Sequence, residues 1–304
     1  MVGIGLILFM VMMAAPPVAA ADSQAPAIDW LKCIGGSELD KALCIEQTTD
    51  SGYIFCGISK SNDGDASGNH GGDTDAWAVK TDAEGNPVWH TCLGGISFED
   101  ARDIHQTADG GYIVAGDVHS TDGEYTVNHG STDAWVAKLN ADGEVMWQKC
   151  IGGTCNEMIY RICQISDGGY IFAGETASVD GEMAGNHGEG SSQDGLVGKL
   201  DSEGNILWLT FLGGEGSDYL HGLCETSDNG YVVTGYARST DEIFVSNLTS
   251  GFHGGDYDAW AVKLDSDGAV EWQNCFGGTS KEQFWDVVQA GGRWICCRRI
   301  HVFK

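Results

Sequence analysis

One motif returns about every sixty residues along this chain, and it limits the possible folds more than any other feature. A tryptophan followed by an apolar residue and a Gly-Gly pair occurs five times, at intervals of 59, 58, 61 and 64 residues. The five tryptophans are Trp30, Trp89, Trp147, Trp208 and Trp272. A period of this length predicts a stack of similar units, because one unit alone cannot bury its apolar surface.

Each repeat holds four short apolar runs that predict β-strands. In the second repeat they cover residues 101–107, 112–118, 134–139 and 145–151, and turn residues separate them. No run has the length or the periodicity of a helix. We therefore predict an all-β protein, a β-propeller of four-stranded antiparallel blades with four complete repeats and a truncated fifth. An open β-solenoid is the alternative.

The repeats divide the chain into three parts. Residues 1–21 form an apolar run that ends in small residues, which is typical of a secretion signal peptide. Residues 22–290 contain the repeats, and residues 291–304 depart from the pattern. The repeat boundaries are about 30–88, 89–146, 147–207, 208–271 and 272–290.

The departure after residue 290 predicts a change of reading frame. The strand of the earlier repeats, of the type Gly-Gly-Tyr-Ile-Val-Ala-Gly, is replaced from residue 291 by a segment that contains Trp294, Cys296 and Cys297. Codons that spell this segment encode Gly-Gly-Tyr-Val-Val-Ala-Gly-Tyr-Thr-Ser when they are read one nucleotide out of frame. We interpret residues 291–304 as a frameshifted tail.

The charge of the chain excludes several classes of partner. There are 44 Asp and Glu residues against 16 Lys and Arg, a formal net charge of −28. Such a field repels phosphate backbones and anionic lipid surfaces, so we expect no nucleic-acid partner. No stretch after the signal peptide has the roughly 18 apolar residues of a membrane span. We expect a secreted or cell-surface protein that binds an extracellular protein or a polysaccharide.

A polar loop that repeats once per unit contains the candidate metal ligands. Its pattern runs from Asp-Gly to Asn-His-Gly, and carboxylate and amide oxygens on such a loop are the ligands that Ca²⁺ prefers. The candidate calcium ligands are Asp63, Asp65 and Asn69; Asp122, Glu124 and Asn128; and Asp180, Glu182 and Asn186. The alternative is that these side chains only bind backbone amides and shape a turn. The spacing does not match a twelve-residue EF-hand loop.

Histidines and cysteines recur as well. The histidines His70, His129, His187 and His253 occur once per unit, so we expect them to lie apart and not to share a Zn²⁺ ion. Cys33, Cys92, Cys150 and Cys275 occupy one repeat position, which Phe211 takes in the remaining copy, and this favours buried free thiols. The alternative to free thiols is a disulfide from Cys33 to Cys44 or from Cys150 to Cys155. The sequon at Asn247 is a candidate glycosylation site.

The repeats resemble those of secreted bacterial and archaeal cell-surface proteins. The segments that carry the likeness are residues 61–71, the Asp-Ala-Trp at residues 75–77 and the strand at residues 106–116. It covers about residues 28–290. The resemblance implies a propeller-like fold and an extracellular location, and it implies no particular activity.

No catalytic motif is present in the sequence. A catalytic acid–base pair would be expected to break the repeat symmetry, and the candidates of this kind are Glu157, Asp218 and Glu242. We therefore expect a non-catalytic extracellular binding or structural module, with calcium as a candidate stabilising ion and no other cofactor predicted. The alternatives are a secreted propeller enzyme, either glycan-cleaving or quinone-dependent, and a lectin-like sugar binder.

Overall fold

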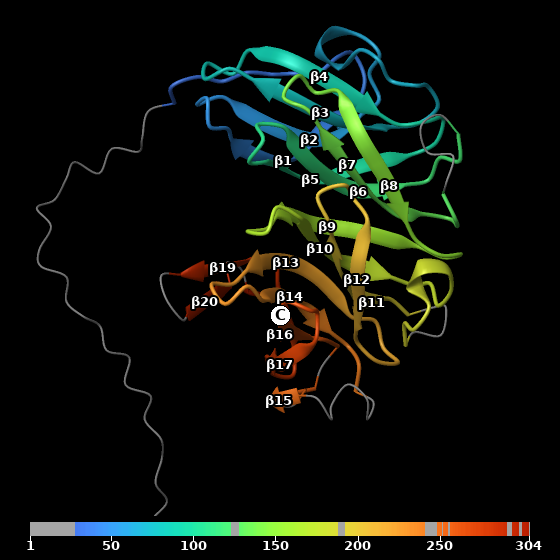
Figure 1. The fold of residues 1–304 in the computed structure, drawn as a ribbon, viewed down its shortest axis with the longest axis vertical. Coiled ribbons are helices and arrows are strands. Elements are labelled where there is room, and N and C mark those ends of the chain that lie inside the picture. The colour runs from blue at the N-terminus through green and yellow to red at the C-terminus, as the bar shows by residue number, and fades with distance from the viewer. Residues whose placement is uncertain are drawn as a thin grey trace, which may run out of the picture. The chain divides into compact units, whose positions relative to one another are not determined.

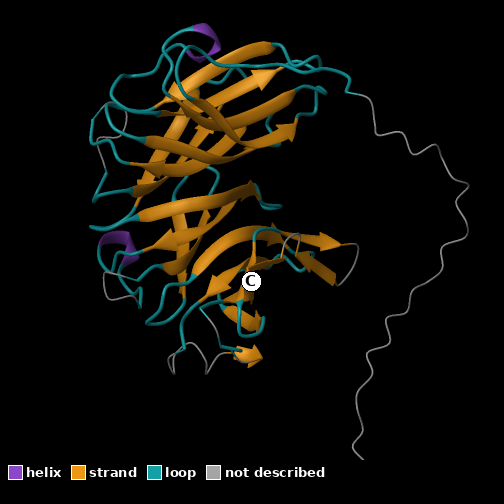
Figure 2. Ribbon diagram, turned by 180° about the vertical axis from the view of Figure 1, so that it is seen from behind, coloured by secondary structure: helices purple, strands orange, loops and turns teal. Residues whose placement is uncertain are grey.

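The structure is a computed structural model that describes residues 28–122, 128–187, 192–240, 248–250, 252–254, 256–290, 294–297 and 300–303. Residues 32–304 form one compact unit, to which the description refers. Its described residues are mostly strands and loops, with two short 3-10 turns, η1 (Gly64–Ala66) and η2 (Gly181–Met183). Figure 2 shows these turns within an otherwise all-β unit. The predicted signal peptide at residues 1–21, Glu124 and Asn247 lie outside the described residues.

Three repeats form antiparallel sheets of four strands in chain order, as predicted. The first contains β1 (Asp40–Gln47), β2 (Tyr53–Ser59), β3 (Asp75–Thr81) and β4 (Pro87–Leu93). The second contains β5 (Glu99–Gln106), β6 (Tyr112–Val118), β7 (Asp133–Leu139) and β8 (Val145–Ile151). The third contains β9 (Glu157–Gln164), β10 (Tyr170–Thr176), β11 (Asp194–Leu200) and β12 (Ile206–Leu212).

The fourth repeat has the same four strands and one addition. Its strands are β13 (Tyr219–Glu225), β14 (Tyr231–Ala237), β16 (Asp258–Leu264) and β17 (Val270–Phe276), and β15 (Leu248–Ser250) pairs in parallel with β17. The propeller-like arrangement of four-stranded blades is therefore confirmed.

The fifth repeat is incomplete, in agreement with the prediction. Strands β18 (Lys281–Phe284) and β19 (Val287–Ala290) occupy the place of its first strand. They pair with β21 (Ile300–Phe303) and β20 (Trp294–Cys297), respectively. The described part of the predicted tail therefore lies where a second strand would lie. The reading-frame hypothesis concerns the gene and stays a prediction.

Successive blades pack face to face, and their first strands lie side by side. Strand β5 contacts β1, β9 contacts β5, β13 contacts β9, and β19 contacts β13. We call this row of first strands, β1, β5, β9, β13 and β18–β19, the inner edge. Figure 1 shows β1, β5, β9 and β13 following one another in this order.

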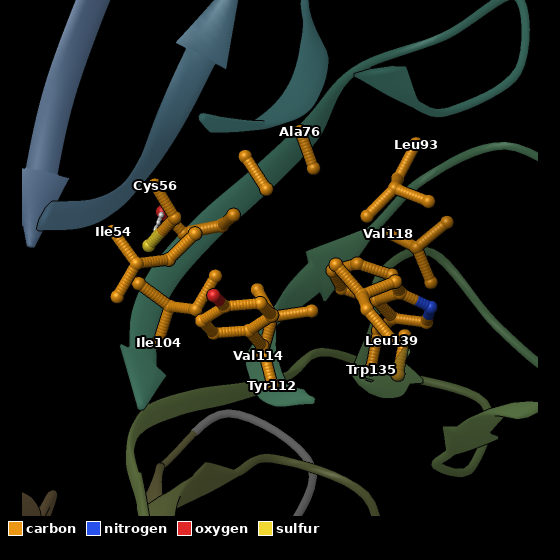
Figure 3. Close-up of a cluster of buried hydrophobic side chains, with 13 residues drawn as sticks. Ile54, Cys56, Ala76, Leu93, Ile104, Tyr112, Val114, Val118, Trp135 and Leu139 are labelled. Atoms are coloured by element: carbon orange, nitrogen blue, oxygen red, sulfur yellow. Dashed lines mark hydrogen bonds between the residues drawn. The ribbon is translucent and has the colours of Figure 1, made fainter. Parts of the chain in front are cut away.

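Aromatic and aliphatic side chains fill the space between blades. Figure 3 shows one such core, in which Ile54 of the first blade lies beside Ile104 and Tyr112 of the second, and Trp135 of the second blade lies farther along the same core. The tryptophans of the fourth strands contribute from outside: Trp89 Nε1 donates to the Ala141 carbonyl at 3.0 Å, across 52 residues of sequence. The motif that defines the repeat therefore joins one blade to the next.

Every first strand of the four complete blades contains a β-bulge, and a glycine lies opposite it. The bulge residue is Leu43, Arg102, Tyr160 or His221, according to the blade. At Gly174, an added Cβ atom would lie 1.8 Å from the Met158 carbonyl oxygen. The same distance holds at Gly57, Gly116 and Gly235 with the equivalent carbonyls. Only glycine lets the bulged backbone come this close.

Candidate functional site

The aspartates of the repeated loop bind backbone amides of the Gly-Gly turn that precedes the first strand of the same blade. Asp63 Oδ1 accepts a hydrogen bond from Ser37 N at 2.7 Å. Asp122 Oδ1 accepts one from Ile96 N at 3.2 Å, and Asp180 Oδ1 one from Thr154 N at 2.9 Å. These carboxylates therefore hold two loops together in each of three blades.

The other predicted calcium ligands that the structure describes also contact the backbone of their own blade. The side-chain nitrogens of Asn69, Asn128 and Asn186 donate to carbonyl oxygens at 3.0, 3.2 and 2.9 Å, and their side-chain oxygens accept from backbone amides. Glu182 Oε2 accepts from Gly152 N at 3.0 Å, and the backbone amide of Asp65 donates to the Gly35 carbonyl at 3.1 Å. The three asparagines and Glu182 thus have the amide-binding role expected as the alternative to calcium.

Three of the four repeated histidines bind a buried aspartate at the start of the third strand. The distances from Nδ1 to Oδ2 are 2.6 Å for His70 and Asp75, 2.7 Å for His129 and Asp133, and 3.0 Å for His253 and Asp258. Burial raises the pKa of Asp75, and the hydrogen bonds from His70 oppose this shift. His187 instead donates its backbone amide to Asn186 Oδ1 at 2.8 Å.

The structure keeps the loop residues of different blades separate. Among the residues that it describes, no three His, Cys, Asp or Glu side chains are grouped so that they could hold a metal ion. Calcium also binds asparagine oxygens and backbone carbonyls, which are not among these four side-chain types. The calcium assignment therefore stays a prediction. A site there would have to share these side chains with the backbone amides they already bind.

Two of the acids considered as symmetry-breaking candidates are in fact repeated. Glu157 Oε2 accepts from Gly153 N at 2.8 Å, and Asp218 Oδ2 accepts from Gly214 N at 3.1 Å. Asp40, Glu99 and Glu282 make the equivalent bond in the other blades. Alternation between Asp and Glu hides this equivalence in the sequence. These acids support the Gly-Gly turn, and Glu242 lies outside the described residues.

The repeat symmetry is broken on the inner edge. The bulge position is occupied by a different residue type in each blade, and Trp285 takes it in the fifth: the series is Leu43, Arg102, Tyr160, His221 and Trp285. The sixth residue of the second strand varies in the same way, through Ile58, Asp117, Glu175 and Tyr236. A bulge redirects one side chain out of the sheet, and bulges are common beside functional sites. This edge is therefore the candidate binding site.

An aromatic cluster lies on the inner edge of blades three to five and on the strands beside it. It consists of Tyr160, Tyr219, His221, Tyr236, Tyr257 and Trp285. The ring of His221 is stacked on Trp285 with centroids 4.5 Å apart, and Tyr219 is stacked on Tyr236 at 4.7 Å. Tyr257 is 4.6 Å from Tyr236. Burial lowers the pKa of His221 to about 4, with Arg161 and Arg102 adding to the shift.

A buried carboxyl group lies against this cluster. Glu175 is 3% exposed, and its Oε2 atom has no hydrogen-bond partner among the described residues. Burial raises the pKa of Glu175 to about 7, although a hydrogen bond with the Tyr160 hydroxyl and the charge of Arg102 act against the shift. A buried polar atom without a partner is costly, and a bound ligand can satisfy it.

Arg102 lies beside the aromatic cluster and is already paired. Its Nε atom donates to Asp117 Oδ1 at 2.7 Å, and its Nη2 atom lies 3.2 Å from Asp100 Oδ2. The guanidinium carbon also lies 5.1 Å from the centroid of the Tyr160 ring. Two carboxylates and one ring thus fix the position of this cation.

A cavity of about 720 Å³ opens on the other part of the inner edge, and Cys44, Asp103, His105, Arg161, Cys163 and Cys224 are among its lining residues. Asp103 accepts hydrogen bonds from Ile162 N at 2.9 Å and from the Cys44 thiol at 3.1 Å. His105 Nδ1 lies 2.7 Å from Glu46 Oε2. Burial alone would lower the pKa of His105, but Asp103 and Glu46 raise it to about 10.

The nine cysteines whose side chains are described are all free thiols. The bridges considered between Cys33 and Cys44, and between Cys150 and Cys155, are not formed in the structure. Burial raises the pKa of Cys92, Cys150 and Cys275 to about 12, which agrees with a packing role.

Comparisons with known proteins identify no family for this chain. No family model matches the chain, and no curated protein matches its sequence. It is similar to two mutants of Synechocystis apocarotenoid oxygenase, both at 14% identity, with TM-scores of 0.33 and 0.35 and coverage of 66% and 83% of this chain. It is also similar to a eukaryotic initiation factor at 9% identity, with a TM-score of 0.32 over 80% of this chain. The chain spans 44%, 52% and 57% of those three chains, respectively.

Among the described residues, no helix is long and apolar enough to cross a membrane.

Proposed function

We propose that this chain is a non-catalytic extracellular or cell-surface binding module that uses the inner edge of its blades to hold an extracellular protein or polysaccharide. The observation that carries the proposal is the contrast between equivalent positions of the repeats. The glycine opposite the bulge is the same in each complete blade, and the acid that supports the Gly-Gly turn is always Asp or Glu. By contrast, Arg102, Tyr160, His221 and Trp285 differ at one bulge position. Chemical variety at a structurally fixed position suits recognition.

The composition of this edge supports binding to a partner. Partly exposed tyrosine and tryptophan rings contribute large contact area at a small entropic cost, which is why they are enriched at binding surfaces. The extracellular location follows from the predicted signal peptide at residues 1–21 and from the resemblance of the repeats.

The proposal is tested with the full chain against an immobilised panel of extracellular matrix proteins and polysaccharides, by biolayer interferometry. Arg161→Ala combined with Trp285→Ala changes the inner edge, and Asp63→Ala combined with Asp65→Ala changes a loop. We expect binding that the inner-edge pair weakens at least tenfold and the loop pair leaves unchanged. Binding that only the loop pair removes would contradict the proposal.

A secreted enzyme is the second candidate, because the Glu175 carboxyl has its pKa raised to about 7, the range of a general acid. Glycan cleavage requires a second carboxyl group that faces the same bond. The nearby Asp117 is bonded to Arg102 at 2.7 Å and so is committed to that cation. Release of reducing sugar ends from the bound polysaccharide would favour the enzyme, whereas binding without turnover supports the module.

A further inference from the structure

We infer that the aromatic cluster of the inner edge binds the rings of neutral sugars, and this inference rests on the binding function proposed above. The cluster joins Tyr160 of β9, Tyr219 and His221 of β13, Tyr236 of β14, and Trp285, which lies between β18 and β19. A partner would therefore contact three consecutive blades at once.

The rings form a surface and not a cage. His221 and Trp285 are nearly parallel, with an angle of 21° between their planes, and Tyr219 and Tyr236 are inclined by 28°. Because these rings cover one another's faces, they do not enclose the space that a quaternary ammonium group occupies in an aromatic cage. Trp285 is 40% exposed and so presents part of a large ring to solvent. The C–H face of a pyranose ring packs well on such a surface.

The polar atoms at the cluster suit hydroxyl groups. The charge of Glu175 raises the pKa of both Tyr219 and Tyr236, so its carboxyl group lies near both phenols. Its Oε2 atom is buried and has no partner among the described residues. A carboxyl group that is part-protonated near neutral pH can accept a hydrogen bond from one sugar hydroxyl or donate one to another.

The net charge of the chain favours neutral over acidic sugars. Two arginines lie beside Tyr160. Asp117 and Asp100 neutralise Arg102. Arg161 donates to the Tyr160 carbonyl at 3.4 Å and lies 3.9 Å from Asp103 Oδ1. The whole chain carries a formal charge of −28, which repels carboxylated or sulfated polymers. An acidic sugar would therefore be repelled by the chain as a whole, whereas a neutral sugar meets no such repulsion and has hydrogen-bonding groups that match the site.

The inference is tested on the full chain with an array of neutral oligosaccharides and matched oligosaccharides that contain uronic acids. Neutral ligands found in this way are then titrated by tryptophan fluorescence. We expect Trp285→Ala and Glu175→Gln each to weaken binding at least tenfold. Phe276→Ala is the matched control, because Phe276 is an aromatic residue of similar exposure, 46%, on the outer strand β17 and should leave the affinity unchanged.

The outcomes separate this inference from the proposed function. If no neutral sugar binds but a protein or an acidic polymer binds in a way that the inner-edge pair weakens, the sugar assignment is wrong and the binding module stands. Neutral-sugar binding that Trp285→Ala and Glu175→Gln leave intact also overturns the assignment. If nothing in either panel binds, both proposals fail. Melting temperatures of all variants show whether each protein is folded.

Discussion

The repeated loops and the inner edge belong to the same sixty-residue unit, but they differ in how far their residues vary between the blades. In the loops, Asp63, Asp122 and Asp180 make one and the same bond to a backbone amide in three blades. On the inner edge, one bulge position holds Arg102 in the second blade and Tyr160 in the third. Sameness across repeats marks what the blade needs in order to fold, and difference marks what is free to serve a ligand.

The two kinds of position depend on each other through a glycine. Gly174 is repeated in every complete blade, and it accommodates the bulge that presents the variable Tyr160. The constant part of the repeat therefore supports the variable part.

The largest expected effect comes from filling this glycine. In Gly174→Ala the new methyl group would lie 1.8 Å from the Met158 carbonyl oxygen, so the two strands must separate. We expect a loss of more than about 4 kcal/mol in the free energy of unfolding, because the clash involves backbone that cannot rotate away. Urea unfolding followed by far-UV circular dichroism measures it.

Gly278→Ala is the control for this variant. No atom lies within 4 Å of its added Cβ, and we expect a change within about 0.5 kcal/mol. Equal losses in the two variants would show that the bulge does not require its glycine.

Glu175→Gln tests a position whose residue type varies between the blades. The Glu175 pKa is raised from 4.5 to about 7, so between these values the folded state holds a proton that the unfolded state releases. The wild-type protein should therefore lose stability as pH rises from 4.5 to about 7, by as much as about 3 kcal/mol. The glutamine variant should lack this loss.

Unfolding free energies measured in urea at pH 5, 6, 7 and 8 test the effect. Parallel pH profiles for the wild type and Glu175→Gln would mean that Glu175 is ionised throughout, which would remove one support for a neutral ligand.

Much of the constant part was predictable from the sequence, and the variable part was not. Trp89, the Gly-Gly pairs and the Asp-Ala-Trp strands recur at fixed spacing, so the blades and their strands follow from counting. Tyr160, His221 and Trp285 belong to different residue types, so no recurring residue marks their position, although each lies seven residues after the second glycine of its Gly-Gly pair. The same holds for Glu175 and Tyr236, whose equivalence is visible only after the second strands are aligned.

A recurring polar motif stands out in a sequence, so the sequence points first to the repeated loop as a functional site. The structure shows that Asp63, Asp122 and Asp180 bind backbone amides there, and calcium at this loop stays a prediction. A column-by-column alignment of the repeats, with a search for columns that vary in polarity, would have directed attention to Arg102 and Glu175.

Calcium binding by the repeated loops, if it occurs, is expected to have a smaller effect on stability. If the loop of the first blade holds Ca²⁺ through Asp63, Asp65 and Asn69, millimolar calcium should raise the melting temperature of the wild type relative to EDTA. Asp63→Ala combined with Asp65→Ala should then show a smaller rise, because the loops of the other blades remain. Loss of the bond to Ser37 N alone would instead cost about 1 kcal/mol, equally with calcium and with EDTA.

Differential scanning fluorimetry of both proteins in the two buffers separates these cases. A wild type whose melting temperature is the same with calcium and with EDTA would remove calcium from the account of the loops.

The smallest expected effect lies in the cavity of the inner edge. Asp103 and Glu46 raise the pKa of His105 from 6.5 to about 10, so the folded protein keeps a proton on this ring that the unfolded chain loses above pH 6.5. Stability from this pair is therefore complete below pH 6.5 and decreases as pH rises toward 10. The imidazole is 35% exposed, so solvent screening should limit the effect to about 1 kcal/mol or less.

His105→Gln should remove this slope, and the difference from the wild type should be read between pH 8 and 9.5, where Glu175 is already ionised in both proteins. The two inner-edge groups thus titrate in separate windows of one experiment. A wild-type profile that is flat from pH 8 to 9.5 relative to His105→Gln would show that the imidazole is not held charged by its carboxylates, and the cavity would then present a neutral ring to any ligand.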